Sequence, residues 1–103
     1  MWIFLNNAFI SMVEHREQPD SLMIRARSEG DIERLFNDAE VTETPTADYR
    51  FRATVTKQEA AAAISSKVQS IDYDNFKNSV DENDRHDAYL GVWSVMHGYQ
   101  NRR

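Results

Sequence analysis

The sequence predicts one α+β domain over residues 1–103, with helices covering one face of an antiparallel sheet of about four strands. Three observations support this class. Some segments alternate apolar and polar residues, as strands do, and others repeat apolar residues every three or four positions, as helices do. Only two prolines and three glycines are present, which argues against a long linker. The length suits one hydrophobic core. We therefore predict a two-layer sandwich, ferredoxin-like or related.

The N-terminal part of the chain is expected to supply two or three strands. Apolar residues fill positions 2–5 and 8–13, on either side of Asn6 and Asn7. Asn tolerates a positive φ, so this pair could close a tight hairpin, and one unbroken strand through the pair is the alternative. Residues 21–27 alternate in character and form the next expected strand.

A short helix and two further strands are expected next. Ser28 can cap the helix, which buries a stripe formed by Ile32, Leu35 and Phe36. Residues 40–44 suit a short edge strand. Residues 49–56 form the clearest strand, because aromatic and small apolar residues alternate with arginine and threonine.

Helices are expected to occupy most of the remaining chain. The capping box of Thr56 and Glu59 begins a helix that runs to about Ser70. Its expected buried face, read from three- and four-residue spacing, comprises Ala60, Ile64, Val68 and Ile71.

The C-terminal segment is expected to hold one or two helical turns within residues 72–80 and then a longer helix. Residues 81–84 supply the cap of that helix, which runs to about His97 with Gly98 as its C-cap. The expected apolar stripe of this helix is formed by Tyr89, Val92, Trp93 and Met96.

Composition restricts the compartment and the kind of partner. The chain has no cysteine, which rules out disulfides and thiolate chemistry. No apolar run approaches the ~18 residues needed to span a bilayer. The first residues lack the basic start and the cleavage site of a signal peptide, so we expect a cytoplasmic protein. A net charge of −5 disfavours general binding to nucleic acid or to anionic membranes.

Four arginines on two expected strands form the main candidate binding site. If the strands are neighbours, these side chains share one sheet face and could bind phosphate, RNA or an acidic protein; they are Arg25, Arg27, Arg50 and Arg52. The alternative is an ordinary solvated face whose arginines pair with Glu14, Glu40 or Glu43. Alternation places Tyr49 and Phe51 on the opposite face, which weakens the case for base stacking.

An acidic corner is the second candidate site. Asp72, Asp74, Asp84 and His86 could support a small hydrolase or gather a divalent cation. The alternative is a structural corner, in which nearby aromatic residues pack and the polar residues cap helices. No spacing matches a calcium loop, a thiolate metal site or a serine nucleophile. We therefore assign no catalytic residue, no metal site and no cofactor.

One resemblance covers nearly the whole chain. Asp72-Tyr73, Asn75-Phe76-Lys77, Asp84-Arg85-His86-Asp87-Ala88-Tyr89 and Val92-Trp93, together with residues 2–8 and 24–31, resemble small bacterial proteins of unknown function. The resemblance implies no biochemical role and adds no site residue.

The sequence favours a non-catalytic interaction protein that binds another protein or forms a homodimer. No reactive constellation is visible, whereas charge is segregated and large aromatic residues are numerous. A small, acidic, cysteine-free chain also suits a phage or mobile-element inhibitor of host defence, such as an anti-CRISPR protein. The alternatives are an RNA- or phosphate-ligand-binding module that uses the four arginines, and a small hydrolase at the acidic corner.

Overall fold

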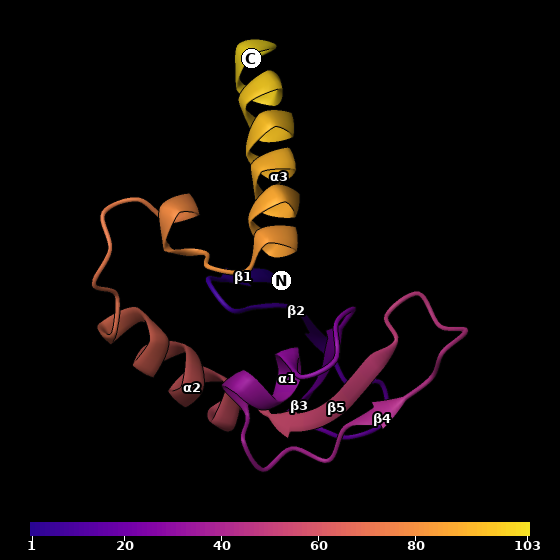
Figure 1. Ribbon diagram of the computed structural model, residues 1–103. Coiled ribbons are helices and arrows are strands. Elements are labelled where there is room, and N and C mark those ends of the chain that lie inside the picture. Colours follow the sequence, from indigo (N-terminus) through magenta and orange to yellow (C-terminus); the bar gives the residue numbers. More distant parts are fainter. The chain divides into compact units, whose positions relative to one another are not determined.

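The computed structural model describes all residues, 1–103, and divides into two compact units (Figure 1). The first unit, Met1–Ile71, contains the sheet and two helices. The second unit, Asp72–Arg103, contains a 3-10 turn and a long helix. Each unit is described by itself below.

The first unit is built on a five-stranded sheet. Its strand order is β1-β2-β3-β5-β4, and every neighbouring pair is antiparallel. The predicted α+β class, with helices packed on an antiparallel sheet, is therefore confirmed. The strands are β1 (Trp2–Leu5), β2 (Ala8–Glu14), β3 (Ser21–Ala26), β4 (Thr42–Glu43) and β5 (Phe51–Thr56).

The Asn pair closes a hairpin. Leu5 lies opposite Ala8 in the ladder, so only Asn6 and Asn7 connect β1 to β2. Of the two alternatives left open by the sequence, the hairpin is confirmed, but neither Asn6 nor Asn7 takes the positive φ on which the prediction rested.

Both helices of the first unit pack on the same face of the sheet. Helix α1 (Asp31–Leu35) contacts β2, β3 and β5, and α2 (Lys57–Gln69) contacts β3 and β5. The order of elements differs from the β-α-β-β-α-β order of the ferredoxin-like fold, so the sandwich is a related architecture. The core between the layers contains Ile10, Met12, Ile24, Ala26, Ile32, Leu35, Phe36, Phe51, Ala53, Val55 and Ala60.

The two helix starts use different chemistry. At α2, the Thr56 side chain accepts from the N–H of Glu59, and the Glu59 carboxylate accepts from the N–H of Thr56, so the predicted capping box is confirmed. At α1, the prediction that Ser28 caps the helix is wrong. The N-cap is Gly30, whose φ of +91° is readily reached only without a Cβ.

The predicted buried face of α2 is only partly buried. Ala60 is in the core, and Ala63 and Ile64 are half-buried against it. Val68 and Ile71 are exposed, so that part of the prediction is wrong. Contact with the sheet is confined to the first turns of the helix, where the capping box fixes its direction.

The second unit consists of η1 (Lys77–Ser79) and α3 (Asn83–Asn101). The predicted end of α3 near His97 is wrong, because Gly98 lies inside the helix. A glycine ends a helix when it takes a positive φ, and Gly98 does not. The N-cap is Glu82, with no side-chain cap hydrogen bond. Neither α3 nor any other helix combines the length and the apolar character needed to cross a bilayer.

Candidate binding surfaces

The strand register gathers part of the arginine set on one side of the sheet. Arg25 of β3 lies directly opposite Ser11 of β2 and Arg52 of β5. Cross-strand partners point to the same side of a sheet, and this side is opposite the core residues Ile24 and Ala53. We call this side the arginine face and define it by Ser11, Val13, Met23, Arg25 and Arg52.

Two of the four arginines are already neutralised by carboxylates. Nε of Arg50 lies 2.7 Å from Oε2 of Glu43, which confirms that ion pair among the predicted alternatives. Nη1 of Arg27 lies 3.2 Å from Oδ1 of Asp48 and donates to the Asp48 carbonyl at 2.9 Å. The hydrogen bond to the Asp48 carboxylate raises the pKa of Arg27 above its usual range.

The other two arginines have no carboxylate partner. Nη2 of Arg25 donates to Oγ of Ser11 at 3.0 Å, and Nε of Arg52 makes a long contact of 3.4 Å with the Tyr49 carbonyl. Nε of Arg25 is buried and makes no hydrogen bond. Arg25 and Arg52 therefore form a pair of like charges, directly opposite each other on adjacent strands.

Tyr49 lies on the arginine side of the sheet, contrary to the prediction. The residue is 4 % exposed, and the guanidinium carbons of Arg25 and Arg27 lie 4.5 and 4.1 Å from its ring centroid. The cause is that β5 begins at Phe51, so the alternation of the strand does not extend back to Tyr49. Cation–π contact with two guanidinium groups is a role that the sequence pattern did not reveal.

A hollow of about 560 Å³ lies on the arginine face. Val13 and Met23, which are cross-strand partners, contribute apolar surface, while Arg25 and Arg52 contribute charge. Residues 14–17 of the β2–β3 connection complete the lining. His15 of this connection accepts at Nδ1 from the N–H groups of Glu17 and Gln18, so its ring proton is on Nε2.

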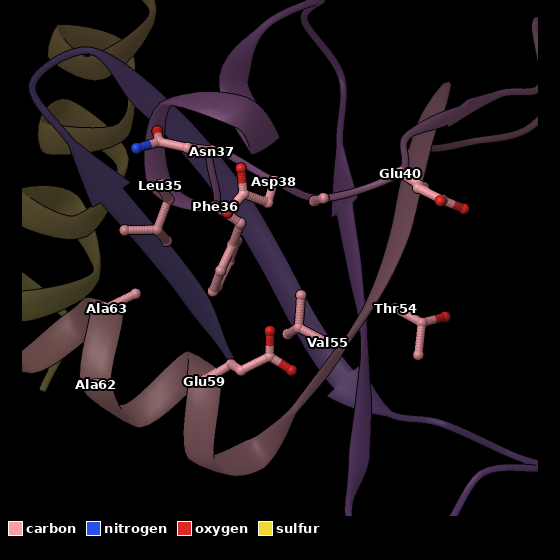
Figure 2. Close-up of a pocket in the computed structure, with 11 residues that line it drawn as sticks. Leu35, Phe36, Asn37, Asp38, Glu40, Thr54, Val55, Glu59, Ala62 and Ala63 are labelled. Atoms are coloured by element: carbon pink, nitrogen blue, oxygen red, sulfur yellow. The ribbon is translucent and has the colours of Figure 1, made fainter.

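A second hollow, of about 630 Å³, lies on the helix-covered side (Figure 2). In Figure 2 the ring of Phe36 points into it, above Glu59 of α2. The acids that line it are Asp38, Glu40 and Glu59, and no basic side chain joins them. Accepting from the backbone N–H and hydroxyl of Thr56 lowers the pKa of Glu59, so this carboxylate serves the start of α2.

The acidic corner lacks the geometry of a metal site. Asp72, Asp74 and Asp84 are exposed, and no group of three His, Cys, Asp or Glu residues could hold a metal ion. Nδ1 of His86 lies 3.8 Å from Oδ1 of Asp87, which is longer than a hydrogen bond. The structure thus offers no carboxylate that orients the His86 ring for acid–base work.

Within the second unit, aromatic residues pack where the sequence suggested a structural corner. The Phe76 ring stacks on that of Tyr89 with centroids 5.6 Å apart, and Nζ of Lys77 lies 5.0 Å from the Trp93 centroid. This packing holds the segment around η1 against the first turns of α3.

Beyond those turns, α3 exposes large apolar side chains. Val95 is 69 % exposed and Met96 is 55 % exposed, and Val92 and Trp93 of the expected apolar stripe are exposed as well. We call the exposed strip the α3 apolar face and define it by Val92, Trp93, Val95, Met96 and Tyr99.

Comparison with models of protein families, with curated proteins and with solved structures gives no match to this chain.

Proposed function

We propose that the protein is a non-catalytic interaction protein that pairs with a second copy of itself through the α3 apolar face. The observation that carries the proposal is the concentration of exposed large apolar side chains on one helix. Soluble monomers rarely leave an extended apolar patch uncovered, and such patches mark interaction sites.

The α3 apolar face has the geometry of a helix-packing seam. Val92, Met96 and Tyr99 follow one another at spacings of four and three, so they lie on one side of the helix. Trp93 and Val95 flank them. Ser94 lies on the opposite side, where an exposed small residue needs no partner. A second helix would therefore contact a surface rich in large side chains, including tryptophan and tyrosine, which are common at binding hot spots.

The charges at the two ends of α3 favour an antiparallel pair. Asp84 is in the first turn, and Arg102 is the C-cap residue. They lie about five full turns apart, so both point to the same flank of the helix. In an antiparallel pair related by a two-fold axis, a given flank of one helix faces the same flank of the other helix. Asp84 and Arg102 are equally far from Trp93 along the chain, so pairing about Trp93 brings each acid beside the partner's base.

The same charges argue against other arrangements. A parallel pair would bring the two copies of Arg103, which follows Met96 by seven residues, to the same end of the seam, and would align the two helix dipoles. We also prefer a second copy to a host-defence protein as the partner, because the charge pattern of α3 complements α3 itself.

The expected affinity is moderate. At 1.5 Å per residue, α3 is about 28 Å long, so two such helices bury an area at the low end of specific interfaces. We therefore expect a monomer–dimer equilibrium that shifts with protein concentration.

Sedimentation velocity of the full chain, over a series of concentrations, tests the proposal. The wild-type protein should move from monomer to dimer as concentration rises. Met96→Glu places a charge in the seam and should weaken association at least about tenfold. Ser94→Glu is the matched control, because it adds the same charge on the opposite side of α3 and should leave association unchanged.

Two results would overturn the proposal. One is a wild-type protein that stays monomeric at every concentration. The other is a loss of association in Ser94→Glu equal to that in Met96→Glu. Both positions are exposed, so circular dichroism should show the same helix content in the two variants.

A further inference from the structure

We infer that the hollow on the arginine face binds a small organic anion through a phosphate or carboxylate group held by Arg25 and Arg52. This inference goes beyond the proposed self-association and uses no residue of α3.

The positive charges of Arg25 and Arg52 are not balanced by any carboxylate within ion-pair distance. Like charges directly opposite each other on neighbouring strands destabilise a sheet. Arg27 and Arg50 show how this chain neutralises arginine at the same end of the sheet, since each has a carboxylate within 3.2 Å. Arg25 and Arg52 lack such a partner, and an anion between them would take its place.

The side chain of Arg25 is held in place without a ligand. Ser11, itself buried, accepts one of its N–H groups, and the Tyr49 ring supports the guanidinium plane. A fixed guanidinium loses little freedom on binding and can present paired donors to a carboxylate or phosphate.

The size and the lining of the hollow suit a small organic anion. Its volume of about 560 Å³ lies within the range of small-molecule sites. Val13 and Met23 contribute apolar surface beside the charged pair, so a ligand with an apolar group next to its anion would contact both. His15 and Arg16 add donors at the rim.

A small ligand fits these observations better than a nucleic acid strand. Glu14 and Glu17 also line the hollow, and the chain carries a net charge of −5, which opposes a polyanion. Tyr49 is buried beneath the arginines, so its ring cannot stack on bases.

Isothermal titration with phenyl phosphate and with benzoate tests the inference and separates the two anionic groups. At least one probe should bind saturably at a one-to-one ratio, and benzyl alcohol, which lacks the anion, should not. Arg25→Gln and Arg52→Gln should each weaken binding about tenfold. Arg50→Gln is the matched control, because Arg50 is paired with Glu43 and lies outside the hollow.

Melting temperatures distinguish a binding role of Arg52 from a purely structural one. Arg52→Gln relieves the like-charge pair, so the ligand-free variant should melt at or above the wild-type temperature. The better probe should raise the melting temperature of wild type but not of Arg52→Gln.

Three results would overturn the inference. The first is the absence of saturable binding by both anionic probes. The second is an equal loss of binding in Arg50→Gln. The third is tighter binding of a ten-residue thymidine oligonucleotide that displaces the small probes, which would make this face a nucleic-acid surface.

Discussion

At the scale of single residues, Asp31 links α1 to the hairpin. It is 1 % exposed; its Oδ2 accepts from the N–H of Phe9 at 2.9 Å, and its Oδ1 accepts from Nη1 of Arg34 at 2.9 Å. Arg34 also donates to the carbonyl of Asn7 at 3.0 Å. One buried carboxylate thus joins the first helix to the turn that the Asn pair creates.

Asp31→Ala should destabilise the protein by about 3 kcal/mol, because it removes a buried carboxylate and leaves the N–H of Phe9 without its acceptor. Urea denaturation followed by circular dichroism measures the change. Glu33→Ala on the exposed side of α1 is the control and should change stability by less than about 0.5 kcal/mol. Equal effects at the two positions would contradict the role assigned to Asp31.

At the same scale, pairing of arginines was predictable only in part. Glu43 was a foreseeable partner for Arg50, because an edge strand lies beside its neighbour. Asp48 was missed as the partner of Arg27, since the two residues meet only through the bend that precedes β5. That same bend moves Tyr49 to the arginine side, and no alternation pattern reports a bend.

At the scale of elements, the start of α2 shows a local signal that was readable from the sequence. Thr56 and Glu59 supply complementary groups at a spacing of three residues, and both hydrogen bonds of the capping box form in the structure. The ends of α1 and α3 were less predictable. Gly30 caps α1 by its backbone conformation, and Gly98 continues α3 although glycine often ends helices.

The lowered pKa of Glu59 predicts a pH dependence with a definite sign. The main cause is acceptance from the Thr56 N–H, so the carboxylate stabilises the fold while it is charged. This contribution is complete above the ordinary glutamate pKa of about 4.3 and is lost as pH falls through the lower folded value.

Glu59→Gln should therefore lose less stability than wild type when the pH is lowered from about 5 to about 2. Urea midpoints measured across this interval give the comparison. Glu33→Gln serves as the control, because Glu33 makes no capping interaction and should follow the wild-type curve. A Glu59→Gln curve parallel to that of wild type would contradict the assigned role.

At the scale of the whole molecule, the sequence was more informative about the sheet than about the binding surfaces. Alternation predicts strands close to the observed ones, because that signal is local, although the expected sheet had about four strands and the structure has five. The apolar spacing of α3 correctly indicated a helix face but not its exposure. A buried stripe and an interface stripe have the same period, and only the fold shows which residues are covered.

The four arginines likewise show that a sequence pattern does not reveal which side chains the fold brings into contact. Sequence spacing identified four candidate arginines. In the structure, Arg27 and Arg50 form ion pairs with carboxylates, whereas Arg25 and Arg52 lie opposite each other without one. The two ion pairs depend on the bend before β5 and on the edge strand β4, which are tertiary features.

The central claim, an antiparallel α3 pair, is tested most directly by site-specific cross-linking. The chain has no cysteine, so every product of a thiol-reactive cross-linker comes from the introduced residues. Asp84→Cys and Arg102→Cys are prepared separately and then mixed. In an equal mixture, random pairing would give one copy of each variant in half of the cross-linked dimers. An antiparallel pair predicts that these mixed dimers, identified by intact mass, exceed one half. Cross-linked species dominated by two copies of the same variant, or no dimer at all, would contradict the account.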